Sequence, residues 1–388
     1  MGTRSIVVTL LAASACGNGS PPKPDSAADG FDRNALLAHL ASNVYLPLQA
    51  DFAAKAAALP PAVSAYCTAL DAPTQNAARA AFGAAIDSWE AAEAVLVGPA
   101  AMDNKALRGL IYSWPLISPC ELDRRTASRL ANPGSYDLAT ELVNTRSLSA
   151  IEFLLYPPND NHNCPQPPPG WDALGANLAA ARCQLALVLA TDVAEKAQTL
   201  YTAWKPDGGN YVGELAKAGT GDSSIKTAQA AVNLVSDGLF YLDAMTKDMK
   251  LGETTGIQVN SCQTVQEACV REVELRYADR QTIALRRNLF AFRQVFTGTT
   301  ATSDGPGFDD YLAFVEHKDL ADRMTASIDA ALVDLDALPA SFLGALSTSY
   351  AQVVTSYHAV DKITDDLKSQ FLTVLALDIP DDVATDND

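Results

Sequence analysis

Residues 32–57, DRNALLAHLASNVYLPLQADFAAKAA, show the pattern that decides the fold of this chain. Their apolar residues recur every three or four positions, which places them on one face of an α-helix: Leu36, Leu37, Leu40, Val44 and Leu48. We expect a helix here, ended by Pro60-Pro61. The same spacing recurs along most of the chain, and no long stretch alternates with a period of two residues. The sequence therefore predicts an all-α protein.

Residues 157–170, PPNDNHNCPQPPPG, interrupt this helical pattern more strongly than any other segment after the first 31 residues. We expect them to separate two helical units, residues 32–160 and 171–380. No short repeat runs along the chain, which disfavours a solenoid. Two packed up-and-down helical bundles are the simplest architecture for this pattern.

The composition is strongly acidic. The chain has 388 residues, with 28 Lys and Arg against 46 Asp and Glu, and its formal net charge is −18. A protein with this charge is repelled by nucleic acid and by anionic lipid, so we expect neither as a partner of the folded part. Hydrophobic residues make up 48% and charged residues 19% of the chain, which excludes general disorder.

The N-terminus predicts export. Arg4 precedes an apolar run, residues 6–15, that is too short to cross a bilayer core of about 30 Å and is typical of a signal peptide. Ala13-Ser14-Ala15-Cys16 resembles a bacterial lipobox, so we expect residues 1–16 to be a lipoprotein signal with Cys16 as the lipidated residue; an ordinary cleaved signal is the alternative. Residues 17–31 are then a flexible tether. Gly at position 17, where Asp would retain a lipoprotein in the inner membrane, favours the periplasmic side of the outer membrane, with the lipid as the membrane contact.

The cysteines fit an oxidising compartment. Of the seven, six are left once Cys16 is lipidated, enough for three disulfides among 15 possible pairings. Pairing neighbours in the sequence gives Cys262–Cys269, Cys164–Cys183 and Cys67–Cys120. No CxxC pair is present, which disfavours a zinc ribbon or a thioredoxin-type dithiol.

The segment Arg146–Tyr156, RSLSAIEFLLY, is the most informative one for function, because the common catalytic signatures GxSxG, HExxH and GxxxxGK[ST] are absent. On a helix, Glu152 shares a face with Ile151 and Leu155, so its carboxylate lies among core residues. It must be paired, protonated, metal-bound or beside a water-filled cleft. A structural ion pair is the simplest alternative, and its candidate partners are Arg79, Arg108, Arg124 and Arg146.

This segment resembles the signature of the imelysin-like family, bacterial envelope proteins also classed as peptidase family M75. In that family, G-x-H-x-x-E precedes a hydrophobic run close to I-E-[FY]-L-L. Here Ser147 stands at the glycine, Ser149 at the histidine and Glu152 at the glutamate. Further likenesses extend over roughly residues 32–380: Ser88-Trp89, Gly98-Pro99, Tyr112-Ser113-Trp114-Pro115, Lys250-Leu251-Gly252, and Arg276-Tyr277-Ala278-Asp279 leading to Asn288.

The resemblance implies an all-helical, two-bundle fold with the motif near the junction of its halves, and an envelope protein tied to iron uptake. The histidine that Ser149 replaces would be the best metal ligand of the motif, so its loss disfavours peptidase activity, and no catalytic residue is assigned. We expect Ser149 to hydrogen-bond a ligand or a bound water.

A second polar group, Arg276, Tyr277 and Asp279, is expected on a second-bundle helix, where it could face Glu152. Tyrosine and carboxylate oxygens suit Fe³⁺, so Glu152 is the candidate metal ligand, with Tyr277 and Asp279 completing an iron site. Two other groups could bind a cation, but a solvated helix face and a tight turn explain them more simply: His358 with Asp361 and Asp365, and Asp160 with Asn161 and His162.

The leading hypothesis is a non-enzymatic, lipid-anchored binding protein whose ligand is iron, an iron complex or a protein of an iron-uptake system. One alternative is an M75-like metallopeptidase that uses Glu152. The other is a structural or adaptor lipoprotein, in which Glu152 belongs to a buried ion pair.

Overall fold

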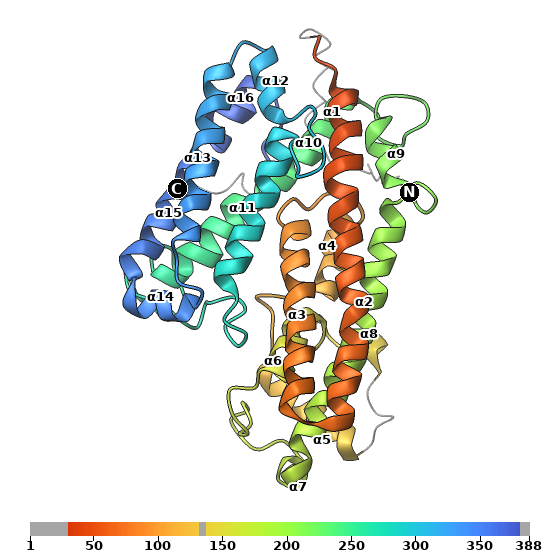
Figure 1. Ribbon diagram of the computed structural model, residues 1–388, viewed down its shortest axis with the longest axis vertical. Helices are drawn as coiled ribbons and strands as arrows, with labels where there is room; N and C mark the ends of the chain where they lie inside the picture. Colours follow the sequence, from red (N-terminus) through yellow and green to blue (C-terminus); the bar gives the residue numbers. More distant parts are fainter. Residues whose placement is uncertain (1–29, 132–136, 381–388) are drawn as a thin grey trace, which may run out of the picture.

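The computed structural model describes residues 30–131 and 137–380, and within them it contains helices and connecting loops but no strand. The prediction of an all-α fold is confirmed. Cys16, the proposed signal peptide and residues 17–29 of the proposed tether lie outside the described residues. Figure 1 shows two groups of helices lying side by side along the long axis of the molecule.

In the first group, α2 packs along both α3 and α8, and α6 packs against α8 and α3. Its main helices are α1 (Arg33–Leu40), α2 (Leu46–Ala69), α3 (Ala72–Glu93), α6 (Ser147–Leu155) and α8 (Leu178–Trp204). A π-helical turn, η1 (Ala41–Tyr45), joins α1 to α2. Short helices cover the ends of this group: α4 (Met102–Ile111), α5 (Pro119–Ala131), α7 (Trp171–Leu174) and α9 (Tyr211–Ala216).

The second group contains η7 (Leu242–Glu253), a π-helix, together with α11 (Gln281–Thr297), α13 (Lys318–Asp336) and α15 (Tyr350–Asp366). Its shorter elements are α12 (Phe308–Phe314), α14 (Phe342–Thr348), η8 (Leu367–Phe371) and α16 (Leu372–Val374). Helix α10 (Ala228–Leu239), which leads into η7, packs against α1 of the first group. The remaining helical turns are short 3₁₀ segments: Gly98–Ala100, Leu138–Thr140, Val143–Thr145 and Gly175–Asn177. Helix α3 packs against α11 and joins the two groups.

The division between the two groups differs from the expected one. Helix α8 follows the polar loop at residues 157–170, yet it packs against α2 and α6 of the first group. The loop therefore lies within the first bundle. Residues 171–204 are also long and apolar enough to cross a membrane, but half of that apolar window is buried in the protein, as in a core helix.

We expected Pro60 and Pro61 to end the first long helix, but they lie inside α2, which continues to Ala69. Leu59 and Val63, on either side of the prolines, are fully buried in the core. Burial of two such side chains stabilises the helix by about 3–6 kcal/mol, the same order as the roughly 6 kcal/mol that two interior prolines cost at about 3 kcal/mol each. Tertiary packing thus offsets the local signal.

One large apolar core extends through both groups, from Leu36 on α1 to Leu377 near the end of the described chain, and a second, small cluster lies around Trp171 and Leu174 on α7. Trp89 on α3 is fully buried and lies with its ring centroid 4.9 Å from that of Phe52 on α2. Because the core is continuous, the two bundles form one packed unit.

The structure has three disulfides, of which the predicted Cys262–Cys269 is confirmed. The other two predicted pairs are wrong: Cys67 pairs with Cys183, and Cys120 pairs with Cys164. Cys67 and Cys183 are 116 residues apart in the sequence, but they lie on α2 and α8, which pack together. The packing of α2 on α8 decides this pairing, and the separation of the two cysteines in the sequence does not predict that packing.

Candidate functional site

Helix α6 carries the segment that resembles the family signature, and it begins at a residue in an unusual conformation. Ser147 has φ = 80°, in the left-handed region that favours glycine. Its hydroxyl oxygen accepts a hydrogen bond of 3.0 Å from the backbone N–H of Ser113 and lies 2.8 Å from the Ser113 hydroxyl. The position therefore has the backbone geometry that explains a glycine in the signature, and the hydroxyl bonds hold the serine there.

Glu152, on the same helix, is 4% exposed. Its Oε1 accepts two hydrogen bonds of 2.9 Å, from the backbone N–H groups of Tyr277 and Ala278. Burial raises the pKa of this carboxyl to about 7, although the two N–H groups and the charge of Arg276 act in the opposite direction. Glu152 is thus a carboxyl group whose ionisation changes near neutral pH.

None of the four expected arginines forms an ion pair with Glu152. Each has another partner: Arg79 donates to the carbonyl of Leu155, Arg108 pairs with Glu93, Arg124 with Glu121 and Arg146 with Asp192. The hydrogen-bond donors to the Glu152 carboxyl are backbone N–H groups. A search for charged side chains as partners therefore misses them.

The segment from Arg276 to Asp279 reaches Glu152, as we expected, but it is an irregular loop and not a helix. Leu275 and Asp279 both have positive φ, 49° and 51°, which interrupts any helix across this segment. The ring of Tyr277 packs edge-on against Phe153, with centroids 5.4 Å apart. Its backbone therefore lies close to α6 and delivers the N–H group to Glu152.

The side chains of this segment point to different partners. The Tyr277 hydroxyl accepts a hydrogen bond of 2.8 Å from Nη2 of Arg276, and Oδ1 of Asp279 accepts one of 3.2 Å from the backbone N–H of Leu343. The Ser149 hydroxyl, on a residue only 3% exposed, has no hydrogen-bond partner among the described residues. Glu152, Tyr277 and Asp279 thus do not share a ligand position through their side-chain contacts.

This donor set does not fit the metal centre of a peptidase. Such a centre needs about three protein ligands and an open position for water. Within residues 30–131 and 137–380, no three or more His, Cys, Asp and Glu side chains are grouped so that they could hold a metal ion. Near Glu152 the signature supplies a serine in place of an imidazole, and the carboxyl already accepts two backbone N–H groups.

A buried charge network that the sequence reasoning missed lies where the two groups of helices meet. Nζ of Lys250, on η7, is 2.6 Å from Oε2 of Glu90 on α3 and 2.9 Å from Oε2 of Glu274. All three side chains are fully buried. Lys250 also donates to Oδ1 of Asn288, on α11, at 2.9 Å. The cation therefore connects elements from both groups.

Further hydrogen bonds close this network. The Asn288 amide donates to the backbone carbonyl of Glu90 at 2.8 Å and to its Oε2 at 2.9 Å. The Tyr112 hydroxyl donates to Oε1 of Glu274 at 2.9 Å. Beside it, Arg108 pairs with the fully buried Glu93. Tyr112, Lys250 and Asn288 belong to stretches that resemble the family, so the likeness in sequence corresponds to one place in the fold.

The charges of the network balance when one carboxyl holds a proton. Burial raises the pKa of Glu274 to about 8, and repulsion from Glu90 adds to this, while Lys250 acts against it. Burial alone would lower the pKa of Lys250, but the carboxylates of Glu274 and Glu90 outweigh it and raise the value well above normal. The network holds three carboxyl groups, Glu90, Glu93 and Glu274, beside two cations, Lys250 and Arg108.

A sequence signal for the network existed. Glu90 and Glu93 follow Ile86 and Trp89 by four residues, so they lie on the apolar face of α3. The argument that singled out Glu152 applies equally to them. The sequence gives no comparable sign that Lys250 and Glu274 would meet them.

Comparison with known proteins identifies the family of this chain. The model of the protein family described as Imelysin, peptidase M75, matches residues 44–370. The chain is similar to iron-regulated protein A of Synechococcus elongatus, with 25% identity over 347 residues, 88% of this chain and 86% of the relative.

Two solved structures share the fold. An imelysin-like protein from Psychrobacter arcticum has a TM-score of 0.68 at 17% identity and covers 90% of this chain and 96% of its own. An iron-regulated protein A precursor from Parabacteroides distasonis has a TM-score of 0.69 at 18% identity and covers 92% and 96%.

Proposed function

Since this chain belongs to the imelysin family, we propose that it is a non-enzymatic binding protein of the bacterial envelope, linked to iron uptake. The observation that carries this proposal is the state of Glu152. Its carboxyl is buried against two backbone N–H groups, with Ser149 where the family signature has a histidine. This arrangement supports recognition of a ligand at the junction of the bundles and offers no metal centre for peptide hydrolysis.

Export and lipid anchoring at Cys16, on the periplasmic side of the outer membrane, belong to the same proposal. Three disulfides support folding in an oxidising compartment, and one structural relative is described as a precursor. Metabolic labelling with a radioactive fatty acid tests the anchor. Label in the wild-type chain that disappears in Cys16→Ala is the expected result, and equal labelling of both would overturn it.

The link to iron rests on the family and on the relatives that are described as iron-regulated. We expect the ligand to be iron as cargo, an iron complex or a protein of an iron-uptake system. Calorimetric titration of the full chain in detergent with ferric citrate, ferrous iron, zinc and haem tests the first two. Micromolar or tighter binding of an iron species, lost in Glu152→Gln without a fall in the melting temperature, is the expected outcome.

A matched control is Glu267→Gln, because Glu267 is an exposed carboxylate on the disulfide-bridged loop before Tyr277. It should leave binding unchanged. Chelator-sensitive cleavage of a peptide that is lost in Glu152→Gln would instead establish the metallopeptidase. The absence of binding to all four probes, with Glu152→Gln less stable, would favour the structural or adaptor protein.

A further inference from the structure

A pocket of about 330 Å³ opens where the end of α6 meets the loop that follows the Cys262–Cys269 disulfide. One of its lining residues is Tyr277, whose backbone N–H binds Glu152. The lining consists of two arginines, two tyrosines and two prolines: Arg79, Tyr156, Pro157, Pro158, Arg276 and Tyr277.

Each arginine is held over one of the tyrosine rings. The guanidinium carbon of Arg79 lies 4.6 Å from the ring centroid of Tyr156, and Nε of Arg79 donates to the carbonyl of Leu155 at 2.9 Å. The guanidinium carbon of Arg276 lies 4.8 Å from the centroid of Tyr277. These contacts fix the positions of both cations before any ligand arrives.

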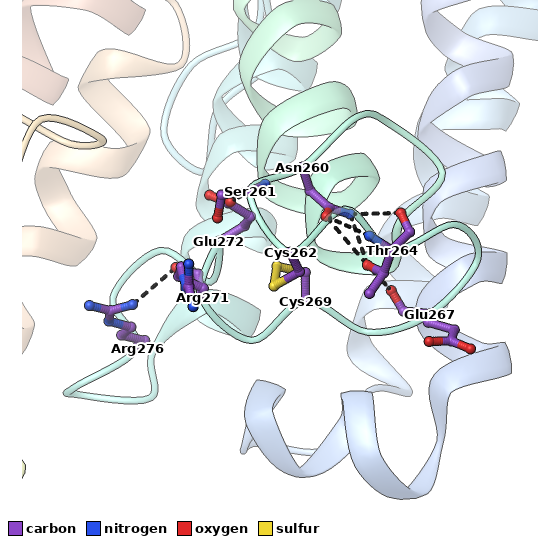
Figure 2. The surroundings of a disulfide bond; sticks show 9 residues. All are labelled: Asn260, Ser261, Cys262, Thr264, Glu267, Cys269, Arg271, Glu272 and Arg276. Carbon is purple, nitrogen blue, oxygen red and sulfur yellow. Dashed lines mark hydrogen bonds between the residues drawn. A yellow bond between two sulfur atoms is a disulfide. The ribbon is translucent and has the colours of Figure 1, made fainter.

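The backbone that follows the disulfide-bridged loop also holds the side chain of Arg276 in position. Figure 2 shows it on the segment that follows this loop, with Nη1 donating to the backbone carbonyl of Arg271 at 3.1 Å. Its Nη2 donates to the Tyr277 hydroxyl. The disulfide between Cys262 and Cys269 thus lies in the segment that presents one of the two cations.

Neither arginine makes an ion pair with a carboxylate that the structure describes. Arg79 uses one of its five N–H donors and Arg276 uses two, which leaves donors of both for a ligand. The neighbouring Arg280 differs, because two of its nitrogens donate to the carboxylate of Asp87. In a chain of net charge −18, two adjacent arginines without such a partner form a distinct positive site.

The nearby acidic groups offset this charge only in part. Asp87 is already paired with Arg280, and Glu152, which interacts with the charge of Arg276, has its carboxyl bound to two backbone N–H groups. A bare cation would be repelled by the arginines, whereas a carboxylate can bind a guanidinium through two parallel hydrogen bonds. Two guanidinium groups that are separately anchored suit an anion with more than one carboxylate.

We infer that the pocket binds a small polycarboxylate anion, either free or as its ferric chelate, between Arg79 and Arg276. The ferric form rests on the proposed function, since it would make the pocket the place where iron is held as an anionic complex. Binding of the anion itself follows from the arginines and tyrosines alone.

The test is calorimetric titration of the full chain in detergent with ferric citrate, citrate, inorganic phosphate and ferrous iron. It is run on the wild type, on Arg79→Gln, on Arg276→Gln and on the control Arg271→Gln. Arg271 is exposed on the same loop and carries the same charge, but it does not line the pocket. We expect each pocket variant to weaken binding of ferric citrate at least roughly tenfold, and the control to bind as the wild type does.

Arg79→Lys keeps the charge but loses the planar pair of donors, so we expect it to bind more weakly than the wild type and more tightly than Arg79→Gln. Melting temperatures of all variants check that each is folded. Citrate binding that depends on the arginines but is not strengthened by iron would support this inference and overturn the link to iron.

Binding of ferric citrate or ferrous iron that both glutamine variants retain would overturn the inference and leave the proposed function standing. Phosphate binding as tightly as citrate would overturn the polycarboxylate class. No binding of citrate or ferric citrate to the wild type would overturn the inference altogether.

Discussion

Two buried carboxyl groups near the junction of the bundles, Glu90 and Glu152, are stabilised in different ways. Glu90 has a cation and an amide as partners, Lys250 and Asn288, which come from the second group of helices. Glu152 has two backbone N–H groups from a loop. The first arrangement ties helices together through an ion pair and a hydrogen bond, whereas the second leaves a carboxyl that gains and loses a proton near pH 7. The comparison separates a carboxyl that pairs with a buried cation from one that is held by backbone donors.

The largest expected effect comes from Lys250→Met, which removes the cation of the first site. It leaves Glu90 and Glu274 buried without their charged partner, so we expect the free energy of unfolding to fall by about 3–5 kcal/mol. Urea unfolding measures this. The control is Lys55→Met, because Lys55 pairs with Asp51 at 3.9 Å and both are about half exposed; it should cost less than about 1 kcal/mol. Equal effects of the two variants would mean that the buried network stabilises no more than a surface pair.

The second effect is a pH dependence that Glu152→Gln removes. The pKa of Glu152 is raised from its usual 4.5 to about 7 in the folded protein, so the folded state holds a proton that the unfolded state releases in this window. The wild type should therefore lose stability relative to Glu152→Gln as the pH rises from 4.5 to 7. At about 1.4 kcal/mol per pKa unit, the difference amounts to about 3 kcal/mol.

Urea unfolding of both proteins at several pH values between 4.5 and 8 checks this change. Above pH 7 the difference should level off, because Glu152 is then ionised in both states. A difference that stays constant across the range would show that Glu152 has an ordinary pKa and would overturn this prediction.

A smaller effect is expected from Ser147→Ala at the start of α6. The alanine keeps a side chain at φ = 80° and loses the hydrogen bonds to Ser113, so we expect a loss of about 1–2 kcal/mol. Ser147→Gly loses the same hydrogen bonds but relieves the backbone, and it should be more stable than Ser147→Ala in thermal unfolding. The reverse order of the two variants would argue against backbone strain at this residue.

The smallest effect is expected from Ser149→Ala, two residues further along the same helix. The Ser149 hydroxyl is buried without a described hydrogen-bond partner, so its removal should stabilise the protein by less than about 1 kcal/mol. Thermal unfolding beside Ser147→Ala makes the comparison direct. A loss as large as that of Ser147→Ala would show that the Ser149 hydroxyl has a partner in solution.

The sequence allowed part of this site to be predicted. The helical spacing around Glu152 correctly placed its carboxyl among core residues, and the same rule would have found Glu90 and Glu93. It failed at Arg276–Asp279, expected on a helix, because the positive φ values at Leu275 and Asp279 come from the packing of the loop. It also failed to find the partners of Glu152. Every residue except proline has a backbone N–H group, so the sequence does not indicate which of them will bind a given carboxyl.

By itself, the sequence determined the helical class, the buried face of α6 and the closure of the small Cys262–Cys269 loop. The physical reason is that each depends on residues close together in the chain, through the period of the helix or a short loop. Only the tertiary structure decided that Cys67 pairs with Cys183, that Lys250 lies between Glu90 and Glu274, and that a loop 125 residues away supplies the N–H group to Glu152. These contacts depend on which helices pack together, a choice made by the burial of the whole core and not by any one stretch of sequence.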